Sequence, residues 1–163
     1  RGAVLSRWQA TPHAGPALAR LAVRTSMRNQ WPCVVQRLED LGQIVRVHLA
    51  LANGAAGAVL AARITRESAE LLGLAPGLPV QALCKATAVR VERAAAAAQP
   101  GLCVLPGKAV RVVRGASGDE VAAALDGGLQ AVGFAAPGSG LRAGSRVALA
   151  VEDNAVVLAL ADL

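Results

Sequence analysis

The chain has 163 residues and a formal net charge of +6; 54% of its residues are hydrophobic but only 2% are aromatic. This length suits one ordinary domain or two small ones. A core must be built from Val, Leu, Ile and Ala, which favours small barrels or tightly packed sheets. The sequence shows no signal peptide, and no apolar run reaches the roughly 18–20 residues of a membrane span. We therefore expect a cytoplasmic protein with no membrane partner.

The positive charge is concentrated near the N-terminus. Residues 1–31 contain five arginines and no acid, so the remaining 12 basic and 11 acidic residues leave a charge of +1. We interpret residues 1–24 as a basic linker that includes a short helix. A basic arm can contact nucleic acid, but the alternation of basic and aromatic residues found in single-strand binders is missing.

The three cysteines form no metal-binding or redox motif. Cys33, Cys84 and Cys103 lie far apart in sequence, without a CxxC pair or a Cys/His cluster. An odd number also argues against a complete set of disulfides. We predict buried, reduced thiols and no metal ligands.

From residue 34 onward the pattern is typical of strands. Residues 44–51 alternate between apolar and polar side chains, and turn signals flank them at residues 40–42 and 53–54. Further strands are predicted over residues 59–64 and, as the closing strand, over residues 80–91. Several short strands around one short helix are the outline of a small five-stranded barrel of the OB type.

The short helix between these last two strands has clear start and stop signals. Thr65 stands at the N-cap position, Gly73 at the C-terminal glycine position, and Pro76 prevents continuation. The helix start offers free backbone N–H groups and the hydroxyls of Thr65 and Ser68, which suit an anion. Lys85, a lone cation in an apolar strand, could fold back to it. An oxyanion pocket and a capped surface helix with an exposed lysine both fit this pattern.

A dense polar string precedes the first strand. Residues 24–31 read Arg-Thr-Ser-Met-Arg-Asn-Gln-Trp, and Ser26 and Arg28, two apart, point the same way on an extended strand. A hydroxyl and a guanidinium on one face match the needs of an oxyanion. A polar connector with a solvated arginine would give the same spacing.

The outline then recurs, which predicts two repeats: residues 25–93 and, after a connector over residues 94–103, residues 104–163. Trp31-Pro32 is echoed by Leu105-Pro106, residues 42–45 by 118–121, and residues 73–77 by 140–144. This alignment places Glu152 where the first copy has Lys85. The second copy has Ala136-Pro137-Gly138 in place of the helix start, so we expect it to be structural.

These motifs resemble a known family. Ile64-Thr65-x-x-Ser68, the turn from Leu72 to Gly77, and Val80-x-Ala82-x-x-Lys85-Ala86 are similar to the molybdate-binding mop repeat, or TOBE domain. Residues 24–31 resemble the Thr-Ser-Ala-Arg-Asn-Gln segment that opens the paired mop region of ModE-type molybdate-dependent transcriptional regulators. Met27, Pro32 and Cys84 depart from the family pattern, but none of them removes a hydrogen-bond donor.

The resemblance implies an all-β fold of two tandem OB-like five-stranded barrels with short helices. It also implies a homodimer that binds molybdate or tungstate as an oxyanion at the subunit interface, without direct metal ligands. By motif position, one side of the pocket would be formed by Ser26, Arg28, Lys85 and Ala86, the last through its backbone N–H. Thr65 and Ser68 would form the other side, from the partner chain.

Three classes of function follow. The first is the ligand-sensing domain of a transcriptional regulator, whose contact with DNA would require a winged helix that residues 1–30 do not supply. The second is a stand-alone molybdate storage protein of the molbindin type. The third is an OB-type module that binds nucleic acid. The polar segment at residues 24–31 favours the first. An enzyme is disfavoured, because the sequence shows no catalytic set and Lys85 has no partner base.

Overall fold

The first half of the chain folds as antiparallel strands around an aliphatic core. A computed structural model describes residues 25–54, 58, 60–93 and 99–160. The long first strand pairs with the second on one side and the fourth on the other, and a bulge at Val35/Arg37 lets it curve between them. The strands are β1 (Asn29–Asp40), β2 (Ile44–Leu51), β3 (Leu60–Thr65) and β4 (Pro79–Cys84).

The predicted helix follows β3 directly and has the predicted ends. It is α2 (Arg66–Leu72), and the Thr65 side chain at its N-cap accepts a hydrogen bond from the Ser68 backbone N–H. Gly73 closes the helix at φ 64°, a left-handed conformation that costs glycine little. The helix buries only Ala69, so neighbouring strands rather than its own length hold it in place.

The second half repeats this arrangement with β6 (Leu102–Val113), β7 (Asp119–Leu125), β8 (Gln130–Ala135) and β9 (Arg146–Glu152). Its long strand has a bulge at the corresponding place, Ala109/Arg111. The pairing registers correct one detail of the predicted repeat: Leu38 pairs with Val47, and its counterpart Val112 pairs with Val121. Val121 is therefore the counterpart of Val47 and not of Val45, because the partners are nine residues apart in the chain in both repeats and no insertion separates the two hairpins.

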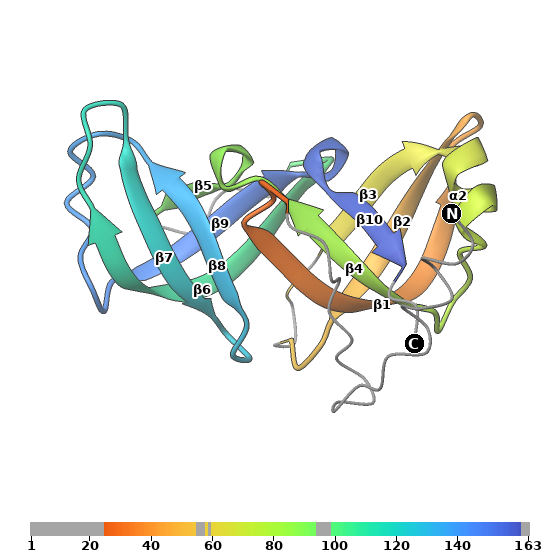
Figure 1. Cartoon of the computed structure of the whole chain (residues 1–163), viewed down its shortest axis with the longest axis horizontal. Helices are drawn as coiled ribbons and strands as arrows, with labels where there is room; N and C mark the ends of the chain where they lie inside the picture. The colour runs from red at the N-terminus through yellow and green to blue at the C-terminus, as the bar shows by residue number, and fades with distance from the viewer. Residues whose placement is uncertain (1–24, 55–57, 59, 94–98, 161–163) are drawn as a thin grey trace.

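The predicted closing strand over residues 80–91 is wrong in its extent. It is broken after β4 by the 3₁₀ turn η1 (Ala86–Ala88), and the chain continues as β5 (Arg90–Glu92). β5 pairs with β8 and β9 of the second half. After the matching turn η2 (Asp153–Ala155), β10 (Val157–Leu160) returns to pair with β4 (Figure 1). Each 3₁₀ turn redirects the chain, so the two halves exchange their last strands.

Two five-stranded units result, in the orders β10-β4-β1-β2-β3 and, as a closed barrel, β5-β8-β7-β6-β9. The two units lie side by side, with β10 in the first and β5 in the second (Figure 1). The predicted all-β fold of two OB-like barrels is confirmed. The predicted repeats divide the sequence near residue 93, but each folded barrel contains four strands of one half and one strand of the other.

Polar side chains fasten the two barrels together at two related junctions. At the first, the Asn29 side chain bonds both to the N–H and to the C=O of Val132, at 2.7 and 2.8 Å. At the second, the counterpart Cys103 places its Sγ 3.3 Å from the Ala61 N–H that donates to it. Asn29 is 1% exposed and Cys103 3%, so both contacts are in the protein interior, where an unpaired polar group would be costly.

The state of the three cysteines was also predicted. Cys33, Cys84 and Cys103 are free and buried, as predicted. Among the described helices none is long and apolar enough to cross a membrane. The arm and helix expected over residues 1–24, and residues 94–98 of the connector, lie outside the described residues.

Candidate functional site

Four of the six expected site residues lie at one end of the β1–β4 pair. Asn29 is opposite Cys84 in this antiparallel pair, so the same register places Arg28 opposite Lys85. Ser26 precedes Arg28 in the chain, and Ala86 follows Lys85 as the first residue of η1. Ser26, Arg28 and Lys85 are exposed while Ala86 is buried. We call this group the cationic cluster.

The backbone N–H of Ala86 differs from its counterpart in the second repeat. Asp153 begins η2 as Ala86 begins η1, and its N–H donates to the Gly101 carbonyl at 2.9 Å. In the part of the chain that the structure describes, the Ala86 N–H has no such acceptor. A buried donor without an acceptor is uncommon, and one beside two cations suits an anion.

Thr65 and Ser68, the other two expected site residues, lie at the N-terminus of α2. Thr65 Oγ1 lies 2.9 Å from Ser68 Oγ and accepts from the Ser68 N–H at 3.1 Å. Both line a groove of about 460 Å³ between α2 and the η2–β10 segment, together with Arg63, Ile64, Leu71, Leu72, Asn154, Val156, Val157 and Leu158. Leu71 is 80% exposed at this groove, an unusual position for a large apolar side chain. We call it the hydroxyl groove.

One chain does not bring the two groups together. The hydroxyl groove includes none of the residues of the cationic cluster, and no hydrogen bond joins the two groups among the described residues. The cationic cluster instead faces the second barrel, where Arg28 Nη2 lies 3.6 Å from Glu120 Oε2 on β7. The sequence did not indicate Glu120, because its proximity depends on the packing of one repeat against the other.

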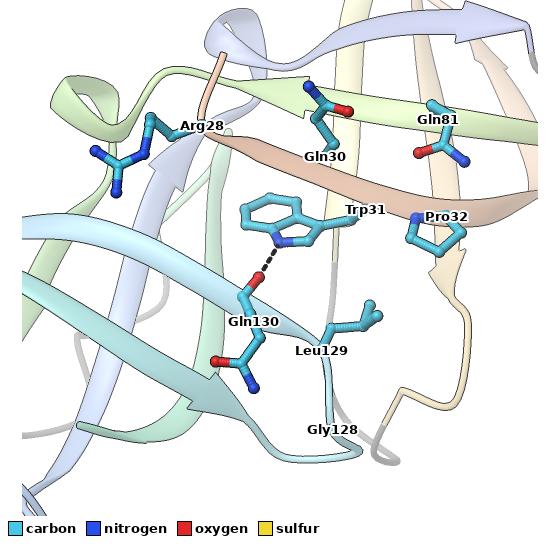
Figure 2. Close-up of a pocket in the computed structure, with 8 residues that line it drawn as sticks. All are labelled: Arg28, Gln30, Trp31, Pro32, Gln81, Gly128, Leu129 and Gln130. Atoms are coloured by element: carbon cyan, nitrogen blue, oxygen red, sulfur yellow. Dashed lines mark hydrogen bonds between the residues drawn. The ribbon is translucent and has the colours of Figure 1, made fainter. Parts of the chain in front are cut away.

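A polar cavity adjoins the cationic cluster and was also not predicted. Its volume is about 490 Å³, and Figure 2 shows Trp31 in it, with its Nε1 donating to the Gln130 carbonyl at 2.9 Å. The guanidinium of Arg28 points away from the end of the cavity that Gln81 lines. The lining residues are Arg28, Gln30, Trp31, Pro32, Gln81, Gly128, Leu129 and Gln130. Trp31 is 1% exposed, so its indole fastens the barrels and is not free to stack on a ligand.

Metal-ligand chemistry finds no support in the described residues. They contain no group of three or more His, Cys, Asp or Glu that could hold a metal ion. Burial raises the pKa of the Cys33 thiol to about 12 and that of Cys84 to about 11. Both thiols therefore stay protonated at neutral pH, and a protonated thiol is a poor nucleophile and ligand.

The fold is a pair of OB-like barrels with a cationic cluster on the first repeat, and comparisons with known proteins support this fold. Residues 25–91 match the TOBE domain family. Over 82 residues, half of this chain, the sequence is 45% identical to the molybdenum-pterin-binding protein MopA of Rhodobacter capsulatus. The match spans only 28% of MopA.

The structural comparison extends further along the chain. The fold is similar to that of the cytoplasmic molybdate-binding protein ModG, solved with molybdate bound, at a TM-score of 0.76 and 28% sequence identity. That match covers 85% of this chain and 99% of the ModG chain. Both barrels therefore have counterparts in a protein that binds molybdate.

Proposed function

We propose that this chain binds molybdate, and also tungstate, as an intact oxyanion at an interface between two copies of itself. The observation that carries the proposal is the convergence of Arg28, Lys85 and the unbonded Ala86 N–H at one end of the β1–β4 pair. A tetrahedral dianion is bound best by charged and neutral donors together. The similarity to ModG and MopA supports molybdate as that dianion.

The partner copy would supply the hydroxyls. Thr65 and Ser68 line their own groove, apart from the cationic cluster of the same chain. Leu71, exposed at the rim of that groove, gives a second chain apolar surface to cover. A site completed across two chains in this way couples ligand binding to assembly. No step in this proposal makes or breaks a covalent bond, so the role is binding and not catalysis.

Two cellular roles fit this binding activity. As the ligand-sensing half of a ModE-type regulator, the chain would transmit occupancy to a DNA-binding domain. As a store, it would hold molybdate in the cytoplasm. The extent of the ModG match, 99% of that chain, favours the second role at least as much as the first. The gene sequence upstream of the Arg1 codon tests this point: a winged helix encoded there supports the regulator.

Competition titrations with four anions at one ionic strength test the binding proposal. Molybdate and tungstate should bind within about tenfold of each other, because they are dianions of nearly equal size. Sulfate and phosphate should bind at least roughly a hundredfold more weakly, or about 2.7 kcal/mol. Donors fixed on two rigid chains for the larger ion stand too far from a smaller one. Sulfate binding as tight as molybdate binding would leave only a generic anion site.

A further inference from the structure

The two junctions between the barrels have opposite charge patterns. At the first, Arg28 of the first repeat pairs with Glu120 of β7. At the second, Asp153 of the second repeat pairs with Arg46, which is the counterpart of Glu120 by strand register. Arg46 therefore has the opposite charge to Glu120 at the same strand position, but their partners differ: Asp153 comes from η2, whereas Arg28 corresponds by strand register to Leu102.

Asp153 is held as a small oxyanion would be. Its Oδ2 lies 2.9 Å from Arg46 Nε, and its Oδ1 lies 3.4 Å from Arg63 Nε, so each oxygen has its own guanidinium. Its side chain is 3% exposed, whereas those of Arg46 and Arg63 are 25% and 42% exposed. The two arginines come from the adjacent strands β2 and β3, where they are opposite each other. A carboxylate buried in this way depends on its partners.

The Arg46 guanidinium is itself fixed from a second side. Its Nη1 lies 3.2 Å from Glu39 Oε1, which also lies 2.9 Å from His48 Nε2. Hydrogen bonds to Asp153 and Glu39 raise the pKa of Arg46. The arginine is therefore oriented by Glu39 whether or not Asp153 occupies its other side.

We propose that Arg46 and Arg63 form a second anion-binding site, which this chain fills with its own Asp153 carboxylate. Asp153 occupies the turn position at which the first junction has Ala86, whose side chain is only a methyl group. The second junction is closed by an internal carboxylate that joins the barrels, whereas Ala86 supplies no such group at the first. This assignment concerns a different site from the proposed molybdate site and stands without it.

Chemical rescue of Asp153→Ala tests this assignment. Loss of the carboxylate should lower the Tm by on the order of 10 °C, because two arginines lose a buried partner. Formate, the smallest carboxylate, fits the space that is left. At 0.2 M it should raise the Tm of D153A by about 3 °C more than chloride does at the same ionic strength, as expected for a dissociation constant of about 50 mM.

Glu152→Ala is the matched control, because it removes the same charge from the exposed neighbouring residue. Formate and chloride should affect E152A and the wild-type chain equally. Equal effects of the two salts on D153A would overturn the proposal, and so would formate rescue of E152A as large as that of D153A. If D153A does not fold in dilute buffer, the yield on refolding is measured instead. Recovery with formate but not chloride supports the assignment, and no difference between them contradicts it.

Discussion

Arg28 of the first repeat lies 3.6 Å from Glu120 of the second, at the edge of the cationic cluster. The two side chains are 52% and 30% exposed, so water screens their attraction. Glu120 also places a negative charge where we propose that a dianion binds. The ion pair therefore joins the two barrels, while the charge of Glu120 would weaken binding of the proposed dianion.

Glu120→Gln should tighten molybdate binding by a factor of about 1.4 to 5, because an exposed ion pair is worth about 0.2–1 kcal/mol. Calorimetric titration measures the change. Glu92→Gln is the control, since Glu92 pairs with Arg90 on β5, away from the cluster. An unchanged or weaker affinity in E120Q would mean that Glu120 does not compete with the ligand.

Variants of Thr65 and Ser68 should distinguish an effect on the stability of the fold from an effect on molybdate binding. Thr65→Ala removes the N-cap acceptor of the Ser68 N–H and should cost about 1 kcal/mol of unfolding free energy. Ser68→Ala keeps that backbone bond, so its stability should change little. Its affinity for molybdate should still fall about three- to tenfold if the hydroxyl contacts the ligand. Urea denaturation and calorimetry on both variants distinguish these effects; unchanged affinity in S68A would exclude its hydroxyl from the site.

Leu71→Glu should weaken both assembly and molybdate binding. A charge on this exposed apolar side chain would be buried against the partner chain in the proposed interface. Sedimentation equilibrium at low micromolar concentration should show a dimer for the wild-type chain and mainly monomer for L71E. Val113→Glu, at a side chain 50% exposed on the second barrel, is the control and should remain dimeric. A monomeric wild-type chain that binds molybdate would refute the interface.

Asp119 should make the second barrel sensitive to acid. Its carboxylate accepts from Ser139 Oγ at 2.8 Å and from Arg114 at 3.0 Å, and these bonds lower its pKa. A carboxyl group whose pKa is lower in the folded state than in the unfolded state stabilises the fold at pH values above its unfolded-state pKa of about 3.9. That contribution is lost as the pH falls from about 4 through the folded-state pKa.

Asp119→Asn should therefore be less stable than the wild-type chain at pH 7 but lose less stability between pH 4 and pH 2. Denaturation curves at several pH values give the unfolding free energy of each protein as a function of pH. An equal pH dependence of the unfolding free energy in the two proteins would show that folding does not shift the pKa of Asp119.

The sequence predicted the features that depend on local chemistry. Thr65 and Gly73 cap α2 as expected, because capping follows from side-chain and backbone preferences within a few residues. The alignment of Glu152 with Lys85 is confirmed, since each precedes a 3₁₀ turn in the same backbone conformation. Turn chemistry was enough to find both features.

The features that depend on packing between repeats could not be predicted. The three residues of β5 carry too little pattern to indicate that they pair with β9 and not with their own repeat. Asn29 was read as part of a polar string, and its bonds to Val132, 103 residues away, appear only in the folded chain. The same holds for the contact of Arg28 with Glu120. Whether the six predicted site residues bind an oxyanion together stays a prediction.

The most direct test compares molybdate binding by Lys85→Ala and Glu152→Ala in calorimetric titrations. The two residues occupy equivalent positions in the two repeats, so K85A removes a cation from the first junction and E152A removes an anion from the second. Loss of a charged donor should weaken binding by K85A about ten- to hundredfold, or about 1.5–3 kcal/mol, and leave binding by E152A near that of the wild-type chain. Equal losses in both variants, or full affinity in K85A, would contradict the placement of the site in the first repeat.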